Sequence, residues 1–410
     1  MSDEEPCGTT PIPTASSSGD SLEVTLDVWS KGVDVAQQPQ TQQIAAYEAK
    51  ADDECINGSL LDVNQHFVVY AVKNGLIRVL HRHSSIKALL RGHQGQVVTD
   101  ISFFLDGDVL ATVGHSPEQG SSKLIVWRVF EQSPEIQAEK LLEVSSDSAK
   151  MNRVLWHPFN PNQLWVLHSL GGGNNNGEKQ HNVATLVETT KIQTTIHPEE
   201  SHPVCRWQSP SVLMEGCVHL NIPGGSLEDL AWSGRDTRHA LTVHSNGQII
   251  LWDLKQSEDA VDAASALSIA VPKKLAVISE SPDTAPISRC LFMPHENAVR
   301  LEGQQDTLTS CFITASHKNS VLTLWSSFTT TPGVLPVKLQ VIKLANPSPS
   351  YALDVCFGPA PQEASPPSCF ILWADRHQGR LLAIHVASQW SAQSKALCVG
   401  GDYVVPFVLH

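Results

Sequence analysis

The sequence has little of what marks a secreted or membrane-spanning protein. No apolar run approaches the roughly 18 residues that a membrane span needs. The start, with Asp3, Glu4 and Glu5, lacks the apolar stretch of a signal peptide. The nine cysteines are scattered and contain no Cys-x-x-Cys motif, which favours reduced thiols over a disulfide framework. We therefore expect a soluble, intracellular protein.

Positive charge is also scarce. Lys and Arg number 28 against 42 Asp and Glu, and the formal net charge of -14 argues against nucleic-acid binding over the whole surface. Residues 1–55 hold eleven of the acids against Lys31 and Lys50, and they are rich in Pro, Ser, Thr and Gln. Such a segment has too little apolar area to offset the entropy of ordering. We expect 1–55 to be a disordered acidic leader.

A 3.6-residue hydrophobic period is nearly absent after residue 55. The apolar residues instead form short runs rich in Val, Ile, Leu and Trp, separated by Gly, Pro, Asn, Asp or Ser, which is typical of β-strands. The exception is the Ala-rich stretch 259–270, which predicts a short helix within a long loop. The sequence therefore predicts an all-β chain.

One strand pattern recurs along the chain: a strand, a turn, a second strand ending in a small or hydroxyl residue, a polar turn, and a strand closing on a large residue. Recurrence of a supersecondary unit predicts a repeat architecture. The units lie near 56–83, 97–129, 152–188, 227–254, 287–328 and 351–386, with a tail strand at 403–410. Spacings longer than the roughly 40 to 45 residues of a compact propeller blade predict insertions, such as 171–177 and 191–225.

These units predict a β-propeller over 56–410. A single blade cannot bury both of its faces, whereas radial repetition buries them and leaves only short edges. Counting the tail strand as a further unit gives seven blades, the last one closed by strands near 56–63. The predicted fold is a seven-bladed β-propeller with long loops between strands.

Several residues give the chain a resemblance to WD-repeat propellers. Gly92 and His93, Thr112 and Trp127 stand where that family places a His, a hydroxyl and a Trp that hydrogen-bond across one blade. The corresponding positions elsewhere are Thr242, Asn246 and Trp252, then Thr314 and Trp325. Asn246 replaces the usual Asp of the turn, and only Trp252-Asp253 is a literal Trp-Asp pair in a third strand. We expect these side chains to be structural.

A more specific resemblance is to the Varicose/Hedls family of mRNA-decapping enhancers. The ordered segments that carry it are KNGLIRVL at 73–80, LLRGH at 89–93, VTDISFF at 98–104 and WHP at 156–158. The resemblance implies a non-enzymatic scaffold without cofactor, which assembles the decapping activator and the decapping enzyme in cytoplasmic processing bodies. A WD-repeat adaptor of another kind, such as a ubiquitin-ligase substrate receptor or a trafficking scaffold, is the alternative.

The family also has a long linker and a helical C-terminal region that binds the enzyme and oligomerises. The sequence ends at His410 with no helical tail. We therefore expect either a fragment or a propeller-only relative, with oligomerisation depending on a region that this chain lacks.

Three segments resemble catalytic or metal-binding motifs, but each departs from its motif at a required position. Residues 172–179 have Glu178 where a phosphate loop requires Lys, and 114–118 have Glu118 where a nucleophile elbow requires Gly. His81 and His83 are flanked by cations, with no Cys or acid nearby in sequence to complete a metal site. We expect no catalytic residue and no metal ligand.

One local charge feature stands out. Residues 67–99 contain five cations and no acid, and the cations are Lys73, Arg78, Arg82, Lys87 and Arg91. We call this set the basic stripe. Alternate residues of a strand share one face, so the stripe is either a solvated surface or a contact for an acidic protein segment or an RNA backbone.

Overall fold

The computed structural model of the chain consists of β-strands, which confirms the predicted all-β class. It describes residues 22–26, 58–118, 120–170, 181–196, 202–207, 215–220, 225–233, 239–254, 273–279, 286–293, 299–300, 308–309, 312–325, 336, 338–345, 351–357, 368–375, 380–391, 396–399 and 404–408. The helix expected at 259–270 and the insertion expected at 171–177 lie outside these ranges. Within them, the helical element is the short 3-10 turn η2 (Lys73–Gly75).

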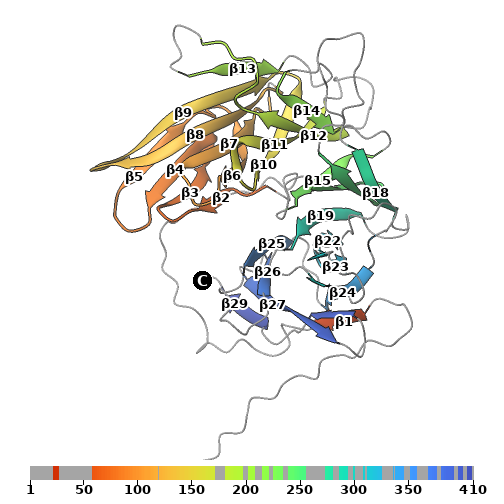
Figure 1. The fold of residues 1–410 in the computed structure, drawn as a ribbon. Helices are drawn as coiled ribbons and strands as arrows, with labels where there is room; N and C mark the ends of the chain where they lie inside the picture. The colour runs from red at the N-terminus through yellow and green to blue at the C-terminus, as the bar shows by residue number, and fades with distance from the viewer. Residues whose placement is uncertain are drawn as a thin grey trace, which may run out of the picture. The chain divides into compact units, whose positions relative to one another are not determined.

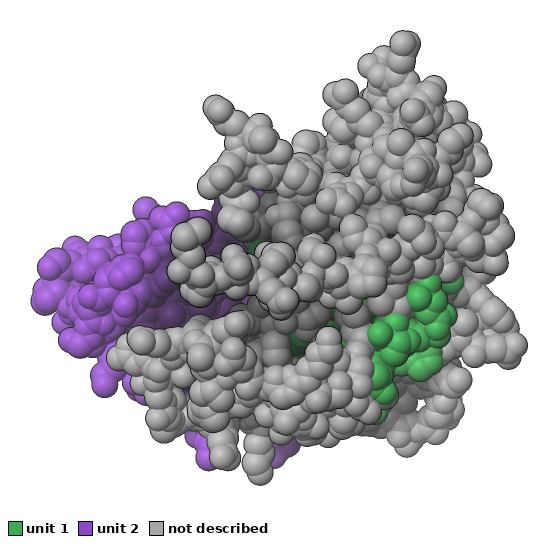
Figure 2. All heavy atoms as spheres, turned by 90° about the horizontal axis from the view of Figure 1, so that it is seen from below, with its two compact units in different colours: residues 1–42, 233–236, 275–410 green, residues 43–232, 237–274 purple. Residues whose placement is uncertain are grey.

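The chain divides into two compact units, which Figure 2 distinguishes by colour. Unit 2 (Gln43–Trp232 and Thr237–Lys274, purple) contains three complete antiparallel meanders and the first three strands of a fourth, whose last strand continues into unit 1 from Leu275. We call each meander a blade. The first two blades are β2 (Leu61–Val63), β3 (Phe67–Val72), β4 (Leu76–His81) and β5 (Lys87–Arg91), then β6 (Val97–Phe103), β7 (Val109–His115), β8 (Ser122–Gln132) and β9 (Glu135–Ser146). The third and fourth are β10 (Ala149–His157), β11 (Asn160–Leu170), β12 (His181–Glu188) and β14 (Cys217–Leu220), then β15 (Leu227–Trp232), β16 (His239–His244), β17 (Gln248–Asp253) and β18 (Lys273–Ser279).

Each blade of unit 2 buries apolar side chains against the next blade. One cluster joins the first and second blades through residues such as Ile77 and Leu110, and another joins the second and third through Val126 and Leu164. A third cluster joins the third and fourth blades around Trp165. Burial of this apolar area is the main favourable term in folding, so each blade is stabilised by its neighbour in the unit.

Aspartates on the inner strands link neighbouring blades of unit 2. The Asp62 carboxylate of β2 accepts a hydrogen bond from Phe103 N of β6 at 2.6 Å. The buried Asp100 carboxylate of β6 accepts from Ser59 N at 2.7 Å and from Val154 N of β10 at 2.8 Å. Because the donors are backbone groups of the adjoining blades, these bonds set the position of each inner strand relative to the next.

Unit 1 (Met1–Gln42, Ser233–Asp236 and Leu275–His410, green in Figure 2) contains two further blades. The fifth blade is β19 (Ile287–Phe292), β22 (Phe312–Ser316), β23 (Val321–Trp325) and β24 (Lys338–Leu344), and the sixth is β25 (Tyr351–Phe357), β26 (Ser368–Asp375), β27 (Arg380–Ser391) and β28 (Ala396–Val399). A separate two-stranded sheet is formed by β20 (Val299–Arg300) and β21 (Leu308–Thr309). The buried Trp373 and Ile342 belong to the core between the fifth and sixth blades.

The described strands therefore form six blades, and the prediction of seven is wrong. The tail strand β29 (Val404–Val408) pairs with β27, so it completes an edge of the sixth blade instead of beginning a seventh (Figure 1). The residues expected to close the ring include β2, which pairs with β3 as the inner strand of the first blade. An unpaired strand edge invites pairing with other chains. The tail pairs with Arg380–Ile384 of β27, and β28 pairs with a different part of that strand, Ser388–Ser391.

Two segments expected to lack strands contribute them. Within the predicted leader 1–55, β1 (Leu22–Leu26) pairs in parallel with β24, and the other residues of 1–55 lie outside the described ranges. Within the insertion 191–225, β14 completes the third blade and β13 (Val204–Trp207) pairs in parallel with β9. These strands are four or five residues long, too short for their alternation to stand out in sequence.

We expect Asp100→Ala to destabilise unit 2, because it leaves the buried Val154 N without its acceptor. An unsatisfied buried donor costs about 1–3 kcal/mol. Urea unfolding followed by tryptophan fluorescence measures the change. Asp106→Ala, at an exposed turn position, is the matched control and should change the free energy of unfolding by less than about 0.5 kcal/mol. Equal midpoints for the two variants would contradict the linking role of Asp100.

Candidate interaction surface

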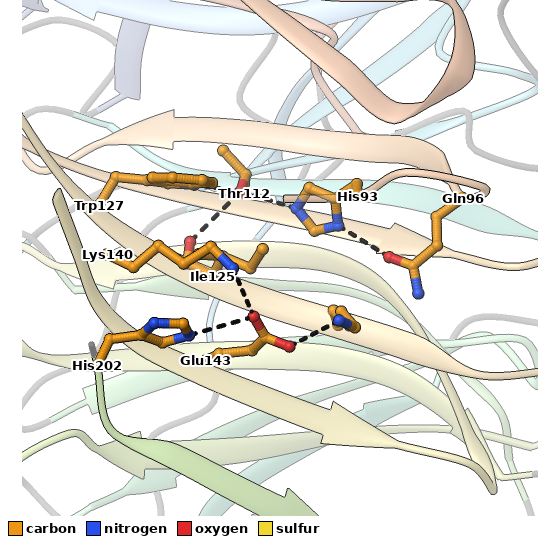
Figure 3. A network of polar contacts seen from close by, with 9 residues as sticks. His93, Gln96, Thr112, Ile125, Trp127, Lys140, Glu143 and His202 are labelled. Atoms are coloured by element: carbon orange, nitrogen blue, oxygen red, sulfur yellow. Dashed lines mark hydrogen bonds and ion pairs between the residues drawn. The ribbon is translucent and has the colours of Figure 1, made fainter. Parts of the chain in front are cut away.

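The second blade has a chain of buried polar side chains centred on Thr112. Trp127 Nε1 donates to Thr112 Oγ1 at 2.9 Å, and His93 Nε2 lies 2.9 Å from the same hydroxyl (Figure 3). His93 Nδ1 lies 2.9 Å from Gln96 Oε1. Burial lowers the pKa of His93 to about 4, so the neutral ring has one N–H at pH 7. The consistent arrangement has Thr112 donating to Nε2 and Nδ1–H donating to Gln96.

The positions expected to be structural in other blades make related contacts. Trp252 Nε1 donates to Thr242 Oγ1 at 2.8 Å in the fourth blade, and Trp325 Nε1 donates to Thr314 Oγ1 at 2.9 Å in the fifth. Asn246 acts in its turn, where its Oδ1 accepts from Gln248 N at 3.1 Å. The four Trp and Thr side chains of these two pairs are buried, as are Thr112 and Trp127.

The third blade has an equivalent network that sequence reasoning missed. Thr185 Oγ1 lies 2.8 Å from His168 Nε2 and 2.7 Å from His219 Nδ1, so two imidazoles replace the Trp. Burial, with a smaller effect of His219, lowers the pKa of His168 to about 3. The sequence predicts a blade at 152–188, but the third strand does not end in a Trp, so the pattern does not indicate this network. The signal available in the sequence was Thr185, a hydroxyl on one strand, followed by His219 on the next strand of the blade.

A second network outside the predictions holds β13 against β9. Glu143 is nearly buried, and its carboxylate contacts Lys123 at 2.7 Å, Lys140 at 2.9 Å and His202 Nε2 at 3.5 Å (Figure 3). Burial opposes ionisation of Glu143, but hydrogen bonds from the two lysines outweigh it and hold its pKa at about 2. The ionised Glu143 therefore anchors the chain just before β13.

The structure brings together three residues of the basic stripe. The register pairs Arg78 with Leu89, Leu80 with Lys87 and Leu76 with Arg91, so Arg78, Lys87 and Arg91 share one face of the first blade. Lys73 lies in the turn η2. Arg82 lies beyond β4, where its Nη1 donates to Asn64 O at 2.9 Å. Within the described residues, none of the three cations on the shared face pairs with a carboxylate.

Apolar side chains surround these cations on the same face. Leu61 and Val63 are 51% and 44% exposed, and the facing residues of β3 and β4 are half-buried. We call this surface the first-blade face, and its members are Leu61, Val63, Val68, Tyr70, Val72, Leu76, Arg78, Leu80, Lys87, Leu89 and Arg91. The opposite side of the blade is buried against the second blade. Larger exposed apolar patches are typical of interaction sites, so this face is a candidate for one.

The described residues include a buried thiol, but neither a cluster of metal ligands nor a membrane-spanning helix. No group of three His, Cys, Asp or Glu side chains in them is placed to hold a metal ion. Burial raises the pKa of the Cys217 thiol to about 12, which leaves it protonated and a poor nucleophile at neutral pH. In the part of the chain that the structure describes, no helix is long and apolar enough to cross a membrane.

These blades define a WD40-type β-propeller protein, with hydroxyl–tryptophan pairs inside the sheets. Residues 40–193 match the family model described as the WD40 region of Ge1, enhancer of mRNA-decapping protein. This region spans β2 to β12 and contains both the Thr112 network and the first-blade face. The resemblance to the Varicose/Hedls family is therefore confirmed over this region, which is less than half of the chain.

Individual relatives are more distant. The chain is 30% identical over 113 residues to Enhancer of mRNA-decapping protein 4 of Danio rerio, which covers 25% of this chain and 8% of that protein. The matched region therefore spans less than a tenth of the length of that relative. The solved β-propeller domain of Cps50 (Swd1) from Myceliophteria thermophila is 12% identical, with 86% of each chain covered and a TM-score of 0.46. The WD40 domain of Toxoplasma gondii coronin is also 12% identical, with 87% and 73% covered and a TM-score of 0.44.

The buried neutral His93 predicts a pH dependence of stability. Its pKa is about 4 in the folded protein and 6.5 ordinarily, so between these values the unfolded chain binds the proton and the folded chain does not. The free energy of unfolding therefore falls as pH drops from 6.5 to 4, by up to ~1.4 kcal/mol per pH unit from this residue. We expect His93→Gln to be less stable at pH 7 but to show a shallower slope.

Urea unfolding at half-unit steps from pH 7 to pH 4 measures this slope. His83→Gln, at an exposed position, is the matched control and should keep the wild-type slope. An unchanged slope in His93→Gln would show that His93 is not the group responsible.

Proposed function

We propose that the protein is a non-enzymatic interaction scaffold in mRNA decapping and 5′-to-3′ mRNA decay. The observation that carries the proposal is the match of residues 40–193 to the WD40 region of Ge1. The scaffold assembles the decapping activator and the decapping enzyme in cytoplasmic processing bodies. Rigid blades with many connecting loops suit such a role, because they present binding residues without any need for catalysis.

The first-blade face is the proposed contact for one of these partners. Its three cations, Arg78, Lys87 and Arg91, lie among apolar residues on one side of a sheet. An RNA backbone would make little use of exposed aliphatic side chains such as Leu61 and Val63. An acidic protein segment with apolar residues complements both features. We therefore assign this face to an acidic, partly apolar segment of a decapping protein.

The scaffold role predicts which proteins are captured. Affinity purification of the tagged full chain from cell extract, followed by mass spectrometry, should recover the decapping activator and the decapping enzyme. Recovery should survive ribonuclease, because the contacts are between proteins. If cullin-ligase or vesicle-coat subunits were recovered in their place, the chain would be a different kind of WD-repeat adaptor. Recovery that disappeared with ribonuclease would contradict direct protein contact.

Charge reversal tests the face itself. The triple variant Arg78→Glu, Lys87→Glu, Arg91→Glu should lose capture of one decapping protein by at least tenfold, a ratio equivalent to about 1.4 kcal/mol. Lys73→Glu is the matched control, because Lys73 is an exposed cation of the same blade that lies in the turn. It should capture normally. Unreduced capture by the triple variant, with unchanged circular dichroism, would exclude the first-blade face as the contact.

A further inference from the structure

The strand β1 occupies the outer edge of the fifth blade. Its register runs from Leu22 opposite Gln340 to Leu26 opposite Leu344, in parallel with β24. Residues more than 300 positions apart in sequence are therefore neighbours in one sheet. The edge of β24 is thus able to accept an extended segment that is remote in sequence, by the backbone pairing that underlies strand addition between proteins.

β1 and β13 both pair in parallel at the edge of a blade, and the described side chains make different contacts in the two strands. β13 ends in the buried Trp207 and follows His202, which contacts the nearly buried Glu143. In β1, Glu23 and Thr25 are both exposed, and the ion pair of Glu23 Oε1 with Lys343 Nζ at 2.6 Å is solvent-accessible. Exposed ion pairs contribute little to stability. The contact between Glu23 and Lys343 therefore adds little to the stability of the cover over β24.

A buried acceptor at this edge is also left without a partner. Gln340 is 2% exposed, and within the described residues its Oε1 accepts no hydrogen bond. Gln340 is the ladder partner of Leu22, whose side chain offers no donor. Leaving a buried acceptor unsatisfied is unfavourable. A competing strand with a side-chain donor at this position could satisfy Gln340 Oε1, whereas Leu22 cannot.

The β24 edge nevertheless favours a strand with one particular pattern of side chains. Ile342 and Leu344 are buried on one side of β24, whereas Lys338 is exposed and Lys343 is 40% exposed on the other. Alternate residues of a paired strand follow the same two sides. The sequence of β1, with apolar residues at alternate positions and Glu23 between them, fits this arrangement. A competing segment must have the same pattern.

We propose that the β24 edge is a strand-addition site for a partner protein, and that Leu22–Leu26 covers it as a displaceable segment of the same chain. The partner supplies an extended segment with alternating apolar residues and an acid placed to meet Lys343. Backbone pairing provides the affinity, and the Lys343 contact favours an acidic segment. The N-terminal segment thereby controls access to the fifth blade.

The test uses a fluorescent peptide of residues 20–28 and the full chain, with binding followed by fluorescence anisotropy. Val24→Pro disfavours β1 in the chain, because proline cannot donate to a sheet ladder. We expect this variant to bind the peptide at least about tenfold more tightly than the wild type, whose edge is mostly covered. Equal weak binding to both chains, with unchanged circular dichroism, would overturn the proposal.

A reciprocal charge exchange tests the preference for an acid. In the Val24→Pro background, Lys343→Glu should weaken binding of the native peptide and strengthen binding of a peptide carrying Glu23→Lys. Lys318→Glu, at an exposed turn position between β22 and β23 of the same blade, is the matched control and should leave both affinities unchanged. Failure of the two peptides to exchange preference would overturn the assigned contact.

Light scattering of Val24→Pro without peptide tests whether a second copy of this chain occupies the β24 edge. A monomer supports a partner segment as the competitor. A dimer would overturn that assignment in favour of a second copy of this chain.

Discussion

The buried carboxylate of Asp100 is the interaction on which the arrangement of unit 2 depends most directly. Its two oxygens accept backbone hydrogen bonds from Ser59, before the first blade's inner strand, and from Val154 in the third blade. Three consecutive blades are therefore tied through one side chain of the second. Hydrophobic clusters between the blades supply most of the favourable free energy, but they are not directional. The carboxylate adds direction, because its oxygens must meet specific N–H groups.

Inside the blades, a buried hydroxyl has the corresponding role. Thr112 and Thr242 each accept from a Trp of the following strand, while Thr185 contacts two histidines. A hydroxyl both donates and accepts, so one threonine can satisfy two buried polar neighbours. The partner of the hydroxyl is consequently free to vary between blades. That variation explains why the third blade conforms to the architecture without the Trp of the second, fourth and fifth blades.

The outer edges of the blades are covered by different strands, which are held by different contacts. β13 covers β9 and is held by the buried Glu143 network, whereas β1 covers β24 with an exposed ion pair. β29 covers part of β27. A covered edge does not pair with other chains, and the proposed displacement of β1 would free the β24 edge for a partner. The first-blade face differs from these edges, since it offers side chains in place of unpaired backbone groups.

The sequence by itself determined the all-β class, the first three strands of the repeated units, and the hydroxyl and tryptophan positions, because alternation and turn residues act over a few neighbouring positions. It also placed Arg78, Lys87 and Arg91 in one acid-free region. Tertiary structure alone decided that β29 joins the sixth blade, that β1 leaves the predicted leader for β24, and that Lys73 and Arg82 lie away from the shared face. Strand formation depends on local pattern, but the choice of strand partner depends on which edge remains unpaired after the rest of the chain has folded.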